Sequence, residues 1–130
     1  HIGDSRAYLL RDDSFDRITT DHSWVEEQVE RGMISREQAF RHPQSNIITR
    51  ALGTDPVPPP DLYVGELQAE DRFLLCSDGL TDMVSEERIT RVVRLVDVPE
   101  TAASRLVSEA NLAGGIDNVT ALVVHIHPRD

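Results

Sequence analysis

Five short stretches of the chain have the hydrophobic content or the polar–apolar alternation of β-strands. The expected strands cover residues 5–11, 15–19, 62–67, 72–77 and 119–126. Asp12-Asp13-Ser14 separates the first two stretches with residues typical of a turn, so a hairpin is expected there. Glu70-Asp71 separates the third and fourth stretches, and we expect a tight turn and a second hairpin at this point.

Residues that can cap a helix mark the starts of four predicted helices. Ser23 and Ser35 are each followed three residues later by Glu or Gln, which is the signature of a capping box. Ser85 precedes a third helix, and Pro99 opens a fourth that ends at Gly114-Gly115. The predicted order is two strands, two helices, two strands, two helices and one strand. That grouping indicates an α+β fold with layers of helices and sheet, because a βαβ fold would alternate single elements.

Composition places the chain among ordinary globular proteins. It has 130 residues, 39% of them hydrophobic and 28% charged, which suits one domain with a real core. The longest apolar runs are too short to span a bilayer, so no membrane insertion is expected. No signal peptide is visible, and a cytoplasmic location is expected. The chain begins with His1 rather than Met, which favours a piece of a longer protein.

The net charge of −10 argues against a nucleic-acid partner, because such a surface needs clustered basic residues to displace counterions. The acidic residues can form a solvated exterior, or some of them can be metal ligands, and composition leaves both open. Cys76 is the only cysteine, so an internal disulfide or a zinc cluster is excluded. It follows the apolar run 73–75 and is expected to be a small core residue.

Three aspartates lie beside small residues at the ends of predicted strands. They are Asp4, Asp78 and Asp117. A carboxylate at a strand end is held rigidly, and a neighbouring glycine lets backbone and water approach it. Together such groups suit Mg²⁺ or Mn²⁺, which prefer oxygen ligands. Each aspartate taken singly also fits ordinary turn chemistry, and one sequence does not show that the three converge.

Six motifs in one order extend this interpretation. They are Gly3-Asp4-Ser5-Arg6-Ala7-Tyr8, Thr20-Asp21-His22-Ser23, His42-Pro43, Asn46-Ile47-Ile48-Thr49-Arg50-Ala51-Leu52-Gly53, Leu75-Cys76-Ser77-Asp78-Gly79-Leu80 and Gly115-Ile116-Asp117-Asn118-Val119-Thr120. In this order they resemble the successive motifs of the bacterial branch of the type 2C metal-dependent protein serine/threonine phosphatases. The resemblance covers essentially the whole chain as the C-terminal portion of a single catalytic domain, residues 1–130.

The resemblance implies a four-layer α-β-β-α sandwich with a two-metal centre at one end, whose N-terminal strands are absent from this chain. Asp78 and Asp117 would hold the second metal of the core Mn²⁺ or Mg²⁺ pair, and Asp4 would bind a third, weaker metal with Asp78 shared. No further catalytic residue is implied beyond these ligands. The implied reaction is hydrolysis of phosphoserine and phosphothreonine on proteins by a metal-activated water. Its partners would be a serine/threonine kinase and that kinase's phosphorylated substrates.

The resemblance also assigns residues 35–53 to a flap beside the active site. His42, Asn46 and Arg50 are its polar candidates for substrate contact, although Arg50 also suits a salt bridge. His22 is expected to order the entry to the first helix. The family's Asp-Gly-x-Gly-Gly motif, which supplies the bridging aspartate, does not occur in these 130 residues. A close metal pair needs that ligand to offset cation repulsion, so this chain alone is expected to show little activity.

Two further hypotheses stay open. One is a non-catalytic relative, a regulatory or binding domain that keeps the fold without the metals. The other is a related phosphatase that acts on anti-sigma-factor antagonists. Retention of all three aspartates favours the enzyme, with signal transduction as its setting.

Overall fold

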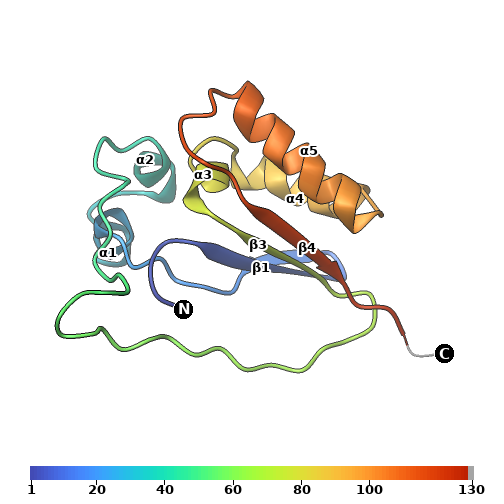
Figure 1. Ribbon diagram of the computed structural model, residues 1–130, viewed down its shortest axis with the longest axis horizontal. Helices are drawn as coiled ribbons and strands as arrows, with labels where there is room; N and C mark the ends of the chain where they lie inside the picture. The colour runs from blue at the N-terminus through green and yellow to red at the C-terminus, as the bar shows by residue number, and fades with distance from the viewer. Residues whose placement is uncertain (129–130) are drawn as a thin grey trace. The chain divides into compact units, whose positions relative to one another are not determined.

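The computed structural model describes residues 1–128 and divides the chain into two compact units (Figure 1). The helical unit consists of residues 1–5 and 20–63. The sheet unit consists of residues 6–19 and of the chain from residue 64 on. None of the helices in the described part of the chain is both long and apolar enough to cross a membrane.

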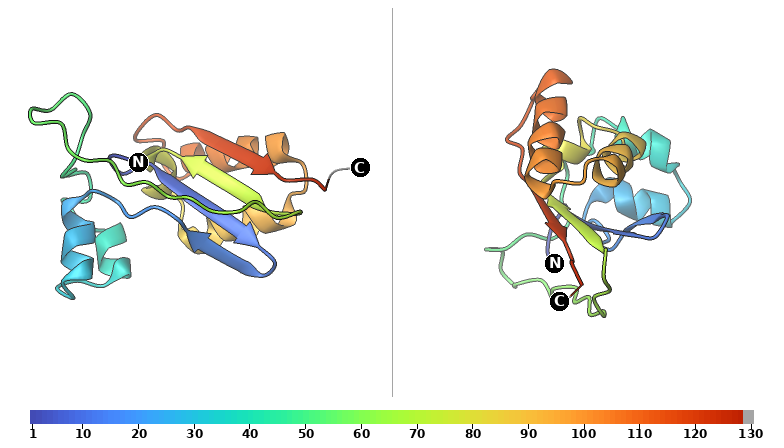
Figure 2. Two further views of the ribbon diagram at one scale, coloured as in Figure 1. Left: turned by 90° about the horizontal axis from the view of Figure 1, so that it is seen from below. Right: turned by 90° about the vertical axis from the view of Figure 1, so that its right-hand side faces the viewer.

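The sheet unit is built on four antiparallel strands. They are β1 (Arg6–Arg11), β2 (Ser14–Arg17), β3 (Arg72–Cys76) and β4 (Ala121–His125), side by side in the order β2-β1-β3-β4 (Figure 2). The hairpin expected between the first two strands is confirmed, and Asp12 at its turn has a φ of 52°. Tyr8 pairs with Leu74, and Leu74 pairs with Val123. These three side chains therefore point to one face of the sheet, and all three are buried.

Three helices, α3 (Asp78–Thr81), α4 (Glu86–Leu95) and α5 (Pro99–Leu112), belong to the same unit. Ile89, Val93 and Leu106 are fully buried in one core with the inner face of the sheet. The opposite face also carries apolar side chains, and there Leu75 is 45% exposed and Leu122 is 54% exposed. The described residues thus provide one sheet and one helical layer of the α+β architecture.

Two arginines anchor the strands to their surroundings. Arg72 donates from Nη1 to the carbonyl oxygens of Val93 (3.0 Å) and Arg94 (3.2 Å), where α4 leaves carbonyls without a helical partner. Arg11 forms a two-pronged ion pair with Asp71, at 2.8 and 2.7 Å. The side chain of Asp71 is only 1% exposed, and its pKa is lowered chiefly by the hydrogen bond from Arg11. Its Oδ2 also accepts from the Gln68 N–H at 2.8 Å, so the guanidinium and this N–H together stabilise the buried carboxylate.

The helical unit contains α1 (Trp24–Glu30) and α2 (Arg36–Phe40). The serine caps are confirmed: Ser23 accepts from the Glu26 N–H and Ser35 from the Gln38 N–H. Only Ser35 forms a full capping box, because Glu26 instead pairs with Arg36 at 2.9 and 3.0 Å. Glu26 is buried, so this ion pair fastens the first helix to the second.

Two sequence predictions are wrong. The strand expected over residues 62–67 does not form, because no described strand pairs with it, and Leu62 and Val64 are 86% and 90% exposed. The turn at Glu70-Asp71 consequently joins no hairpin. The Glu70 N–H donates to the Ile126 carbonyl (2.7 Å), and the Asp71 carbonyl accepts from the Ile126 N–H (2.9 Å), so this turn adjoins the end of β4. The helix α3 was not expected, because Ser77-Asp78-Gly79 also fits a simple turn.

Candidate metal-binding loops

Asp78 stands where β3 gives way to α3, at the first position of that helix. Hydrogen bonds between Ser77 and Thr120 fix this junction. The Ser77 N–H donates to the Thr120 carbonyl (3.1 Å), and the Thr120 N–H donates to Ser77 Oγ (3.0 Å). Asp78 is half-buried, and its side chain has no polar partner among the described residues. The backbone that carries Asp78 is therefore fixed, and its carboxylate is available to a ligand.

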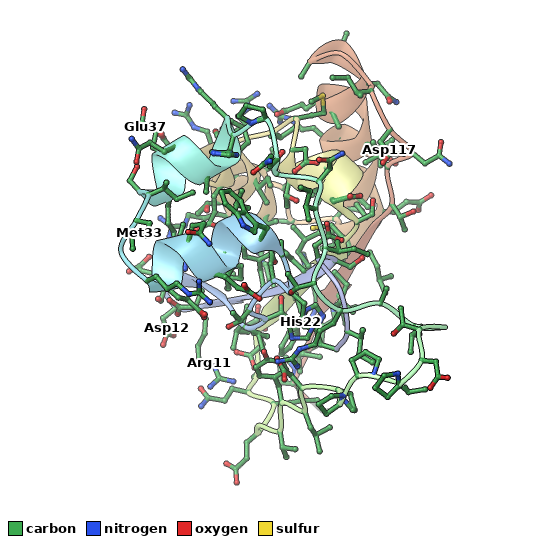
Figure 3. The ribbon with its side chains drawn as sticks, turned by 90° about the vertical axis from the view of Figure 1, so that its left-hand side faces the viewer. Arg11, Asp12, His22, Met33, Glu37 and Asp117 are labelled. Carbon is green, nitrogen blue, oxygen red and sulfur yellow. The ribbon has the colours of Figure 1, made fainter. Side chains whose placement is uncertain are left out.

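Asp117 lies on the exposed loop that leads into β4 (Figure 3). One of its oxygens, Oδ1, accepts from the Asn118 N–H at 2.7 Å, and this contact orients the carboxylate. The loop follows Gly114 and Gly115, both with positive φ, at 140° and 55°. These conformations favour glycine, so the sequence is suited to turn sharply after α5.

Gly79 brings the two acidic loops together. A Cβ at this position would collide with the Asn118 carbonyl oxygen and stand 3.0 Å from its carbon and 3.5 Å from Val119 Cα. The backbone next to Asp78 is thus in direct contact with the backbone next to Asp117. Only glycine permits this approach, since any side chain would meet backbone atoms.

The donor set of these two loops suits a hard cation. Two carboxylates on abutting segments offer oxygen ligands, which Mg²⁺ and Mn²⁺ prefer. They do not form a complete protein-only site. Within residues 1–128, no three His, Cys, Asp or Glu side chains are grouped so that they could hold a metal ion.

Asp4, the third predicted ligand, belongs to the helical unit. It follows Gly3, which has a φ of 111° and exchanges two hydrogen bonds with His22. The His22 N–H donates to the Gly3 carbonyl at 2.8 Å, and the Gly3 N–H donates to His22 Nδ1 at 3.1 Å. The backbone that carries Asp4 is therefore anchored to the start of α1.

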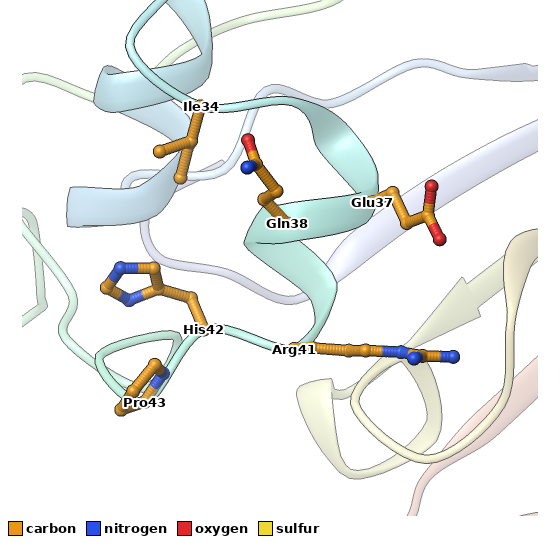
Figure 4. Close-up of a pocket in the computed structure, with 6 residues that line it drawn as sticks. All are labelled: Ile34, Glu37, Gln38, Arg41, His42 and Pro43. Carbon is orange, nitrogen blue, oxygen red and sulfur yellow. The ribbon is translucent and has the colours of Figure 1, made fainter.

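The three flap candidates have different surroundings. The His42 ring lies 5.1 Å from the Trp24 ring, centroid to centroid, and its Nδ1 accepts from the Gln44 N–H. His42 also lines a shallow hollow of about 510 Å³ around α2 (Figure 4). Asn46 is exposed. Arg50 is paired with Asp61 (3.1 Å), which agrees with the salt-bridge alternative.

Asp61 is the polar residue of this unit that sequence reasoning missed. Its Oδ2 lies 2.7 Å from His22 Nε2, and its Oδ1 accepts from Arg50. The hydrogen bond from His22, followed by that from Arg50, lowers the pKa of Asp61. Its place after the run Pro58-Pro59-Pro60 reads as loop chemistry, so no local signal in the sequence reveals these partners.

The chain is similar in sequence to known protein phosphatases. The family model described as Protein phosphatase 2C matches residues 1–119. The serine/threonine protein phosphatase PstP of Mycobacterium tuberculosis is 47% identical over 126 residues, which cover 97% of this chain and 24% of the relative. The serine/threonine phosphatase stp of Listeria innocua is 42% identical over 124 residues, covering 95% of this chain and 49% of the relative.

Solved structures of related phosphatases share the fold over nearly the whole of this chain. The crystal structure of PstP from M. tuberculosis superposes with a TM-score of 0.90 at 46% identity, covering 98% of this chain and 54% of that one. The catalytic domain of PstP in complex with two manganese ions superposes with a TM-score of 0.87 at 44% identity, covering 98% and 52%. The chain spans about half of these structures and of the Listeria relative, and about a quarter of full-length PstP. On the match over residues 1–119, this chain belongs to the protein phosphatase 2C family.

Proposed function

We propose that the chain is the C-terminal part of a single catalytic domain that hydrolyses phosphoserine and phosphothreonine on proteins. The observation that carries this proposal is the direct contact between the loops of Asp78 and Asp117. Two carboxylates on loops in direct contact supply part of the oxygen ligands that a divalent-metal hydrolase requires, and the family match gives the chemistry they would serve.

In this proposal Asp78 and Asp117 hold the second metal of the core pair, and Asp4 contributes to a third, weaker site. The bound Mn²⁺ or Mg²⁺ ions would supply an activated water and stabilise the negative charge on the oxygens of the phosphoryl group. The protein residues keep the oxygen ligands fixed. Asn118 orients the Asp117 carboxylate, and the bonds between Ser77 and Thr120 hold the Asp78 junction.

The proposed setting is signal transduction in the cytoplasm. The substrates would be phosphorylated proteins, with a serine/threonine kinase as the enzyme that supplies them. The manganese complex of the related PstP domain supports the choice of metal.

The test compares Asp78→Asn and Asp117→Asn with the unchanged full-length protein that contains this chain. Hydrolysis of a phosphothreonine peptide is measured while Mn²⁺ is titrated. Loss of a partner outside the metal ligands already costs about 10–100-fold in metalloenzymes, so each substitution should lower turnover by roughly 10²-fold or more.

Asp13→Asn is the matched control, because Asp13 is exposed in the β1–β2 turn and only its backbone carbonyl has a described partner. It should leave turnover unchanged. This chain without the preceding segment should show little or no turnover. A folded full-length protein with no metal-dependent turnover would instead favour the non-catalytic hypothesis.

A further inference from the structure

The side chain of His22 is buried and uses both ring nitrogens. It is 5% exposed, with Nδ1 facing the Gly3 N–H and Nε2 facing Asp61. The Gly3 N–H is a donor, so Nδ1 must accept and carries no hydrogen. Nε2 therefore carries the hydrogen and donates to Asp61 Oδ2. The donor at Nδ1 and the acceptor at Nε2 thus select one tautomer and one ring orientation of His22.

The backbone of His22 adds two further links. Its N–H donates to the Gly3 carbonyl at 2.8 Å, and its carbonyl accepts from the Thr49 N–H at 2.7 Å. On one side His22 therefore holds the turn that carries Asp4. On the other side it holds the end of the predicted flap, residues 35–53, one residue before Arg50.

Asp61 extends the same network. It accepts from Arg50 Nη1 at 3.1 Å, and the same Arg50 nitrogen donates to the Pro59 carbonyl at 3.2 Å. Two backbone hydrogen bonds join His1 and Asp61: the His1 nitrogen donates to the Asp61 carbonyl at 2.8 Å, and the Asp61 N–H donates to the His1 carbonyl at 3.0 Å. They link Asp61 to the segment that leads into Gly3. Residues 1–4, 49–50 and 59–61 are far apart in sequence, and His22 contacts members of all three groups.

We infer that His22 is a positioning residue that holds the Asp4 turn and the flap end around Arg50 as one rigid group. Because the Gly3 N–H bond fixes the backbone immediately before Asp4, the ring controls where that carboxylate is presented. Because the Asp61 bond fixes Arg50 through a shared carboxylate, the same ring controls the flap end. The inference deepens the proposed function and rests on it for the metal-dependent readout alone.

Two substitutions separate the ring's two bonds. In His22→Asn, the amide oxygen can take the place of Nδ1 and accept from Gly3, while the contact with Asp61 is lost. In His22→Gln, the longer amide can take the place of Nε2 and donate to Asp61, while the Gly3 N–H loses its acceptor. His127→Gln is the control, since His127 is exposed and lies in the sheet unit.

The first measurement is amide hydrogen exchange of the full-length protein, which requires no activity. His22→Gln should accelerate exchange in residues 2–5, and His22→Asn should accelerate it in residues 59–61. The second measurement is the Mn²⁺ dependence of phosphopeptide hydrolysis. His22→Gln should raise the Mn²⁺ concentration for half-maximal rate by about 10-fold, with the rate at saturating Mn²⁺ nearly kept, since second-shell partners of metal sites have effects of this size.

The results of the two measurements either support or overturn the positioning role of His22. Opposite exchange patterns in the two variants, with the Mn²⁺ shift confined to His22→Gln, support it. Equal effects of both variants, or none, overturn it, because a merely structural histidine would not separate the two bonds. If the unchanged protein hydrolyses nothing, the proposed function fails, while the exchange patterns still decide whether His22 couples the two segments.

Discussion

Gly79→Ala tests the contact between the two acidic loops most directly. The added methyl group would collide with the Asn118 carbonyl, a backbone atom that cannot rotate away as a side chain can. Residue 79 lies inside α3, where alanine is better than glycine by up to about 1 kcal/mol. Overpacking of a filled interior costs about 1–3 kcal/mol, and a backbone collision falls at the upper end. The cost of the collision should exceed the gain in helix propensity, so the free energy of unfolding should fall by about 2 kcal/mol.

The assay is urea denaturation together with Mn²⁺-dependent turnover of the full-length protein. If the loops separate by roughly 1 Å, turnover should fall on the order of 10²-fold, because reacting groups tolerate little misplacement. Gly65→Ala is the control: nothing lies within 4 Å of the Cβ it would add, and its φ is outside the range that favours glycine. Unchanged stability and turnover in Gly79→Ala would refute the contact between the Asp78 and Asp117 segments.

Further predictions concern the core and the buried carboxylates of the sheet unit. Leu106→Ala should lower the free energy of unfolding by about 2–5 kcal/mol in urea denaturation, because Leu106 is fully buried, while Leu112→Ala on the same helix should change it little, because Leu112 is 85% exposed. Asp71→Asn should destabilise the protein by about 1.5–3 kcal/mol, since the buried side chain would lose its charged hydrogen bonds while Arg11, 31% exposed, can still be hydrated; an unchanged urea midpoint would contradict this. The pKa values of Asp71 and Glu109 are lowered by hydrogen bonds from arginines. Protonation therefore favours the unfolded state, so unfolding titrations should show stability falling as the pH drops below about 4, and falling less in Asp71→Asn.

Local capping signals predicted the helices well. Ser35 and Ser85 accept the backbone N–H groups that the sequence pattern assigned to them, and Pro99 begins α5. Such signals work because cap and partner are only three residues apart. The strand over residues 62–67 failed for the opposite reason. A strand needs a second strand from elsewhere in the chain, and an alternating pattern alone does not provide one.

The candidate site was only partly predictable for the same reason. Asp78 and Asp117 could be named from the sequence, yet their proximity depends on Gly79 packing on Asn118, across about 40 residues of chain. The role of Asp61 could not be predicted from the sequence, because its partner His22 lies 39 residues earlier. The metal-ligand roles of Asp78 and Asp117 remain predictions that their asparagine variants test, and the role of Asp4 remains a prediction that the His22 variants probe through the Mn²⁺ dependence.

The outer face of the sheet has a consequence for how this chain, taken by itself, behaves in solution. Leu75 and Leu122 lie there side by side in the register of β3 and β4, both about half exposed. Apolar contacts act at short range, whereas the net charge of −10 repels other copies over about 8–10 Å at physiological salt. Raising the ionic strength weakens only the repulsion. For this chain taken by itself, added salt should therefore favour association through the half-exposed leucines on the outer face of the sheet.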